Sequence, residues 1–104
     1  MVGVIGRRVY EPRFGSIDDV FGLNTGVMEV VHLYIDVNKR RQGHATQLFQ
    51  YLKQDAKNDG VQKLYLHTHP TLPNAQTFWQ VQGFDVIGEE MIGGMLTVHM
   101  LMVL

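Results

Sequence analysis

Hydrophobic and polar positions repeat with two different periods along this chain, and the change of period predicts its central elements. The run Met28–Val37 is rich in β-branched and aromatic residues, as is typical of a strand. After a short turn, apolar residues recur at offsets 0, 3, 4, 7 and 11, namely Ala45, Leu48, Phe49, Leu52 and Ala56. This spacing predicts a helix over residues 43–58, and the glycine of Asp59-Gly60 stands just beyond its end.

The remaining segments predict the rest of an α/β domain. A second helix is expected from Pro73 to about Gln82, because proline suits the first helical position and Gly83 can end the helix. Further strands are expected at residues 2–10, 61–67, 84–91 and 95–103, the last two forming a hairpin around Gly93-Gly94. Residues 11–26 are rich in glycine and predict a long surface loop. The order β-loop-β-α-β-α-β-β indicates one domain over 1–104 with a mixed sheet.

Composition narrows the class of protein. The chain has 104 residues with 45% hydrophobic content, enough for one modest core. Its net charge of -1 lacks the basic excess of a general nucleic-acid binder, and no apolar run approaches the roughly 20 residues that span a bilayer. There is no cysteine and no leader-like start. We therefore expect a cytoplasmic protein that binds neither nucleic acid nor membrane.

The turn Arg40-Arg41-Gln42-Gly43-His44-Ala45 joins the central strand to the helix and is a candidate anion site. The first amides of a helix have no intrahelical partner, and the helix dipole adds partial positive charge there. Gly43 has no Cβ and would let the backbone approach a phosphate, while Arg40 or Arg41 would neutralise charge. The alternative is that Lys39-Arg40-Arg41 is only a solvated loop. The pattern favours a phosphorylated ligand.

A second segment points to a family. Ala75-x-x-Phe78-Trp79-x-x-x-Gly83-Phe84 resembles the A-x-x-F-Y-x-x-x-G-F signature of the GNAT family of acetyl-CoA-dependent N-acyltransferases. The turn from Arg40 to Ala45 is similar to that family's [QR]-x-x-G-x-[GA] pyrophosphate motif. Leu33-Tyr34-Ile35 stands where the family has a strand end. The resemblance implies a GNAT-like mixed, mostly antiparallel sheet flanked by helices, with acetyl-CoA as cosubstrate.

The resemblance also implies how coenzyme A is held. Its diphosphate would bind the turn residues Arg40, Arg41, Gln42, Gly43, His44, Ala45 and Thr46. Its pantetheine arm would pair like an extra strand with the backbone of Leu33, Tyr34 and Ile35. Trp79 and Asn74 are further candidate contacts, although Asn74 is out of register with the asparagine of many relatives, where this chain has Leu72.

Acyl transfer to an amine needs a base for the amine and a proton donor for the departing thiolate. Glu29 is the first candidate base, because its spacing from Arg40 matches a strand glutamate of histone-type family members. His32 is the second. Strict alternation would place it on the face opposite Glu29, but the family carries a bulge near this point that could realign it. The absence of cysteine favours direct transfer in a ternary complex.

The catalytic acid is not assigned by the sequence. Trp79 occupies the position of the family's tyrosine, and an indole N–H is not a practical proton donor, so Trp79 is expected to pack. His67 is a candidate acid or base. His67-x-His69 lacks a nearby third ligand, so no metal is expected, and His99 is expected to be structural.

The acceptor side is the least determined part. The family usually begins with a strand and two helices, and about 27 residues before the Glu29 strand are too few for that unit. The acceptor side would then be open, covered by residues 11–26, or completed by a second subunit, and we expect a homodimer. The leading hypothesis is an N-acetyltransferase acting on a small-molecule or peptide amine. The alternative is a degenerate, non-catalytic acyl-CoA-binding module, which Trp79 and Leu72 favour.

Overall fold

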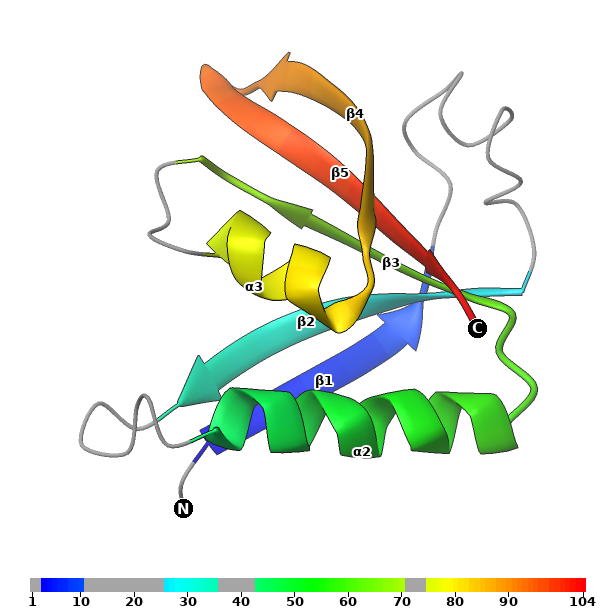
Figure 1. Cartoon of the computed structure of the whole chain (residues 1–104). Coiled ribbons are helices and arrows are strands. Elements are labelled where there is room, and N and C mark those ends of the chain that lie inside the picture. The colour runs from blue at the N-terminus through cyan, green and yellow to red at the C-terminus, as the bar shows by residue number, and fades with distance from the viewer. Residues whose placement is uncertain (1–2, 11–25, 36–42, 71–74) are drawn as a thin grey trace.

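The computed structural model describes residues 3–10, 26–35, 43–70 and 75–104. Their elements follow the predicted order, shown in Figure 1: β1 (Gly3–Val9), β2 (Val27–Ile35), α2 (His44–Asn58), β3 (Lys63–Thr68), α3 (Ala75–Gln82), β4 (Asp85–Ile92) and β5 (Met95–Val103). No helix in these ranges is long and apolar enough to cross a membrane. The predicted start of the second helix at Pro73 and the loop residues 11–25 lie outside the described residues.

The five strands form one sheet in the order β1-β2-β3-β5-β4. Only β2 and β3 are parallel, and their pairing covers three positions, Val27–Glu29 against Lys63–Tyr65. Beyond that point β2 runs on to Ile35 and β3 to Thr68 without pairing to each other, and Figure 1 shows the two strands diverging. The other three neighbour pairs are antiparallel, which confirms the predicted mixed, mostly antiparallel sheet.

Both helices pack on the same face of the sheet (Figure 1). The apolar stripe of α2 buries Phe49, Leu52 and Ala56, as its periodicity predicted. This stripe packs with further buried residues of α3 and the sheet, namely Val30, Leu64, Leu66, Trp79, Phe84, Val98, Met100 and Met102. Each fully buried large apolar side chain stabilises the fold by roughly 1.5–3 kcal/mol, so this cluster fixes how α2 and α3 sit on the strands.

The opposite face of the sheet has a different character. Along β3, Leu64 and Leu66 point to the helices, so alternation turns Tyr65 and His67 to the other side. A smaller apolar cluster lies there, consisting of Tyr10, Val27, Tyr65 and Leu101. No helix within the described residues covers this face, yet it buries the ionisable side chains of Glu29 and His99. Buried ionisable groups are uncommon without a partner or a function, which makes this face the candidate site.

Element boundaries differ slightly from those predicted. Strand β3 begins at Lys63 and not at Val61, because the amide of Val61 still donates to the carbonyl of Ala56 in α2. This bond closes the end of α2, and the amides of Gln62 and Lys63 then both donate to the carbonyl of Gly26, just before β2. Gly60, just beyond that end, has a φ of 79°, as expected of a glycine that terminates a helix.

Candidate active site

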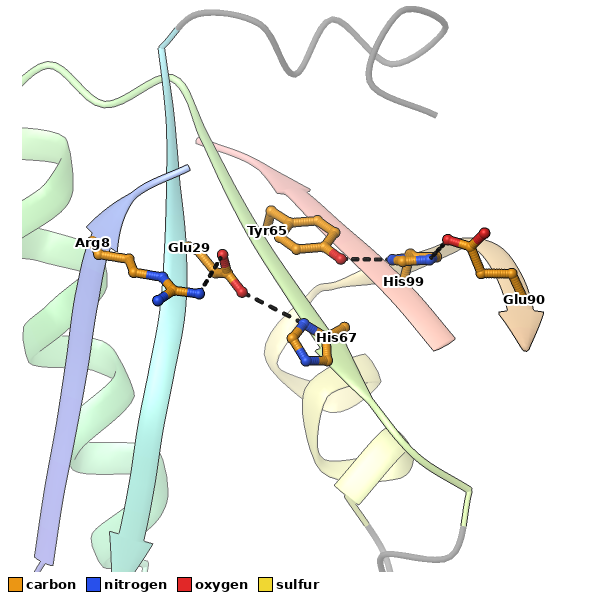
Figure 2. Close-up of polar contacts among 6 residues, drawn as sticks. All are labelled: Arg8, Glu29, Tyr65, His67, Glu90 and His99. Atoms are coloured by element: carbon orange, nitrogen blue, oxygen red, sulfur yellow. Dashed lines mark hydrogen bonds and ion pairs between the residues drawn. The ribbon is translucent and has the colours of Figure 1, made fainter. Parts of the chain in front are cut away.

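Three neighbouring strands bring polar side chains to one carboxylate. Glu29 is 1% exposed, and its Oε1 accepts a hydrogen bond from Nη2 of Arg8 on β1 at 3.4 Å. Its Oε2 lies 3.5 Å from Nδ1 of His67 on β3. Figure 2 shows Glu29 between these two side chains. The sequence singled out Glu29 and His67 separately, and the fold brings them together.

Strand register explains this arrangement. Arg8 is the direct antiparallel partner of Glu29, so the two side chains share a face. Glu29 also forms the last parallel pair with Tyr65, and His67 follows two residues later on the same face of β3. Glu29 therefore stands where β2 and β3 separate, with His67 on the far side of the opening.

The electrostatic setting of Glu29 is a buried anion with cationic or polar neighbours. Burying a carboxylate is costly unless it is paired and hydrogen-bonded, and Arg8 and His67 supply such partners. The Arg8 side chain is 61% exposed, so solvent screens its charge and its contribution is small. Glu29 is thus held in place and retains oxygens that can accept a proton.

A second chain of contacts lies beside the first. The Tyr65 hydroxyl is 2.6 Å from Nδ1 of His99, and Nε2 of His99 is 2.7 Å from Oε1 of Glu90 (Figure 2). Gly88 is the register partner of His99 and has no side chain to intervene, so Glu90 reaches the imidazole from two residues along β4. The His99 side chain is fully buried.

Sequence reasoning missed this second chain. It treated His99 as structural and did not select Tyr65 or Glu90. Alternation along β3 places Tyr65 on the face of His67, which was a usable signal. The contact with His99 depends on the register of β3 against β5, which pairs His67 with His99, and local pattern does not fix that register.

The structure places the other predicted catalytic residues as follows. Tyr34 pairs with Val4 and Val31 with Gly6, so β2 carries one extra residue around His32, an irregularity of the kind expected there. The direction of the His32 side chain lies outside what is described. Nδ1 of His69 contacts the carbonyl of Leu96 at 3.1 Å. Among the described residues, no group of three or more His, Cys, Asp or Glu is placed to hold a metal.

The start of α2 fits the predicted phosphate turn. Gly43 is the N-cap residue, with φ 77°, and it has no side chain to bond the first amides of the helix. The first turn contains no acidic residue, and among the described residues no atom lies within 4 Å of a Cβ built at Gly43. A helix start without a side-chain cap or an acidic residue suits an anion. Arg40, Arg41 and Gln42 lie outside the described residues, as does Asn74.

Trp79 packs in the core, as expected. It is 7% exposed, and its ring lies 5.5 Å from those of Phe49 and Phe84 and 4.8 Å from that of Phe78, all as edge contacts. Such aromatic pairs add roughly 0.5–1.5 kcal/mol beyond their area burial. Its contact with a cofactor stays a prediction.

A family comparison decides what these features have in common. The model of the acetyltransferase (GNAT) family matches residues 2–84. The chain belongs to this family. The assignment confirms the resemblance seen in the turn at Arg40–Ala45 and in the Phe78-Trp79 segment, since both lie within the matched region.

Individual GNAT relatives agree. The chain is 28% identical over 82 residues to "GCN5-related N-acetyltransferase 6, chloroplastic" from Arabidopsis thaliana. This aligned region covers 79% of this chain and 28% of that protein. A ribosomal-protein-alanine N-acetyltransferase from Brucella melitensis superposes with a TM-score of 0.80 at 19% identity, over 99% of this chain and 62% of that one. Ard1 from Thermoplasma volcanium superposes with a TM-score of 0.79 at 14% identity, over 99% of this chain and 63% of that one. The chain therefore has the GNAT fold but spans less than two thirds of these proteins.

Proposed function

We propose that this chain is a GNAT N-acetyltransferase domain that moves an acetyl group from acetyl-CoA to an amine. The observation that carries the proposal is the buried Glu29 carboxylate, held where β2 and β3 separate and 3.5 Å from His67. A carboxylate shielded from water beside a strand opening is suited to general-base work.

The chain's own features suit coenzyme A. Gly43 and the first amides of α2 would take the diphosphate, with Arg40 and Arg41 of the preceding turn neutralising its charge. The edge of β2 over Leu33–Ile35 has no β3 partner, so an extended pantetheine arm could pair along it. When bound, acetyl-CoA would supply an acyl group activated as a thioester.

The residues around the opening then have distinct tasks. Glu29 would accept the proton that the amine loses, directly or through a water molecule. His67 and Arg8 would hold the Glu29 carboxylate toward the opening, and His67 would also relay a proton to solvent, since its side chain is 37% exposed. With acceptor and donor bound together, transfer would be direct.

The acceptor is proposed only as an amine, in a small molecule or a peptide, and a cytoplasmic setting stays a prediction. The test has two parts. Calorimetry should detect coenzyme A binding, and a thiol-release assay with acetyl-CoA should respond to at least one member of a panel of peptide N-termini, lysine, polyamines and small amines. Absence of coenzyme A binding would overturn the proposal.

Glu29→Gln tests the base. It keeps the shape and hydrogen-bonding capacity of the side chain but removes the basic carboxylate, so kcat should fall by about 10²–10⁴-fold while the Kd for coenzyme A stays the same. The matched control is Glu89→Gln, which neutralises an exposed carboxylate on β4 and should leave kcat unchanged. Equal kcat for wild type and Glu29→Gln would remove Glu29 from this role.

The alternative function is a non-catalytic acyl-CoA-binding module. The position of Trp79 favours it, because the indole is buried among phenylalanine rings where the family often has a tyrosine that can donate a proton. Coenzyme A binding without thiol release across the amine panel would support this alternative.

A further inference from the structure

The hydrogen-bonded side chains Tyr65, His99 and Glu90, called the Tyr65–His99–Glu90 relay below, have no role in the proposed acetyl transfer. They lie on the same sheet face as Glu29 and His67 (Figure 2). The relay joins three strands, and both of its contacts are shorter than the Glu29–His67 distance. Tyr65 is fully buried and His99 is fully buried, so water is kept from the link between them. These contacts run from a carboxylate that is 40% exposed, through a buried imidazole, to a buried hydroxyl, and such a connection can carry a proton inward from solvent.

The carboxylate at one end of the relay decides which atom donates and which accepts in each of its hydrogen bonds. A Glu90 carboxylate can only accept, so Nε2 of His99 carries the proton that Oε1 receives. In a neutral imidazole Nδ1 is then an acceptor, and the Tyr65 hydroxyl donates to it. If the His99 imidazole takes up one more proton, both of its nitrogens are donors. The Tyr65 oxygen then accepts from Nδ1, and its own O–H points away from His99 and can donate to another acceptor.

The position of Tyr65 indicates where that proton would go. Tyr65 is the β3 member of the last β2–β3 pair, at the closed end of the strand opening. Ile35 lies six positions after Glu29, and an extended strand rises about 3.3 Å per residue. An arm that starts at the turn before α2 and pairs along β2 would therefore bring its sulfur end toward Glu29 and Tyr65.

We propose that Tyr65 donates the proton to the departing thiolate of coenzyme A and is itself recharged through His99 and Glu90. This inference rests on the proposed acetyltransferase function and fills its unassigned acid. As the amine nitrogen bonds to the carbonyl carbon, the C–S bond breaks and its electron pair goes to sulfur. Tyr65 gives its hydroxyl proton to that sulfur and takes the Nδ1 proton of His99. The proton lost by the amine goes to Glu29.

Other charged or titratable groups face Tyr65, His99 and Glu90 and can also contribute to the pH dependence of kcat. They are Arg8 on β1, Tyr10 just after β1, Glu29 on β2, Lys63 and His67 on β3, and Asp85 on β4. Because Tyr65 can act as the acid only while it holds its proton, the proposed relay predicts that kcat declines at alkaline pH.

Tyr65→Phe tests the donor while keeping the ring that packs against Tyr10 and His99. We expect kcat to fall by about 10²–10⁴-fold and the alkaline decline to disappear, with the Kd for coenzyme A unchanged. Glu90→Gln should lower kcat and shift the same limb. The control Tyr51→Phe removes a hydroxyl from an exposed residue of α2 and should change neither. An unchanged pH profile in Tyr65→Phe and Glu90→Gln would overturn the proposal.

A second readout does not depend on turnover. The imidazole ¹⁵N signals of His99 should move when coenzyme A is added but not when desulfo-coenzyme A is added, because only the former brings sulfur to Tyr65. Equal responses to the two ligands would overturn the relay but leave coenzyme A binding intact. Failure of both ligands to bind would overturn the relay and the proposed function together.

Discussion

At the scale of single residues, the cluster around Glu29 and the cluster around His99 differ in how their side chains are exposed to water. Glu29 and its neighbours lie at an opening and include side chains that are 61% and 37% exposed, whereas His99 is fully buried between Tyr65 and Glu90. The first arrangement allows exchange of protons with solvent. In the second, buried His99 links the buried Tyr65 to Glu90, whose side chain is 40% exposed, so a proton taken up at Glu90 would be delivered at Tyr65.

Arg7 shows a purely structural use of charge on the other face. Its guanidinium on β1 contacts Asp59, the C-cap residue of α2, and Asp55 within α2, the latter at 3.0 Å. Hydrogen bonds from Arg7 to Asp59 and then to Asp55 raise its pKa above the ordinary value. A cation with a raised pKa loses its stabilising contribution only as the pH rises through that pKa, so this contact should persist at neutral and mildly alkaline pH.

We therefore predict that Arg7→Met lowers the free energy of unfolding by about 1 kcal/mol, a small value because both carboxylates are mostly exposed. For a domain of this size, that corresponds to a fall in Tm of about 4–8 °C, measurable by calorimetry. The difference between the two proteins should shrink in 1 M salt, where such pairs are screened. A difference that is independent of salt would assign the effect to packing.

At the scale of elements, the join between β2 and α2 carries the predicted ligand site. Gly43 has a positive φ, and a Cβ there would meet no atom of the described residues within 4 Å. A substitution would therefore strain the backbone without a collision with that part of the protein. Gly60, at the other end of α2, likewise has a positive φ of 79° and no described atom within 4 Å of a Cβ. These two glycines form a matched pair at opposite ends of one helix.

Gly43→Ala and Gly60→Ala should each lose about 1–2 kcal/mol of stability, the cost of a left-handed conformation for alanine. Only Gly43→Ala should also weaken coenzyme A binding, by about tenfold or more, since its methyl group stands where the phosphates would approach. Calorimetric titration of both variants measures this. Equal losses of affinity in the two would indicate a general effect of helix stability.

The sequence predicted the elements well because their signals are local. The stripe of Phe49, Leu52 and Ala56 defined α2, and Gly60 marked its end. The meeting of Glu29 with His67 and of Tyr65 with His99 was not predictable in the same way. Those contacts depend on strand order and register between β2, β3 and β5, which are long-range properties.

At the scale of the whole molecule, the described surface has apolar residues that are not part of either core cluster. Met91, Ile92, Met95 and Leu96 are all exposed and surround the turn of the β4–β5 hairpin. Exposed apolar groups that lie together are typical of association surfaces. This hairpin surface favours assembly.

We accordingly expect a homodimer in solution. Light scattering should give a mass of twice 11.9 kDa, decreasing toward the single-chain value on dilution. Met91→Lys together with Met95→Lys should favour the monomer if the hairpin takes part. A single-chain mass at high protein concentration would contradict the expectation.

The short seam between β2 and β3 has a consequence for how the domain holds together. In the described part of the chain, three paired positions join the β1-β2 ribbon to the β3-β5-β4 sheet, and α2 and α3 both pack on the same side of these two parts. A guest lying along the open edge of β2 would act as a missing strand. Its binding free energy would then also be folding free energy. The domain would be most stable with coenzyme A bound. Release of coenzyme A after the reaction would then loosen the packing of β2 relative to β3, which had aligned the reacting groups.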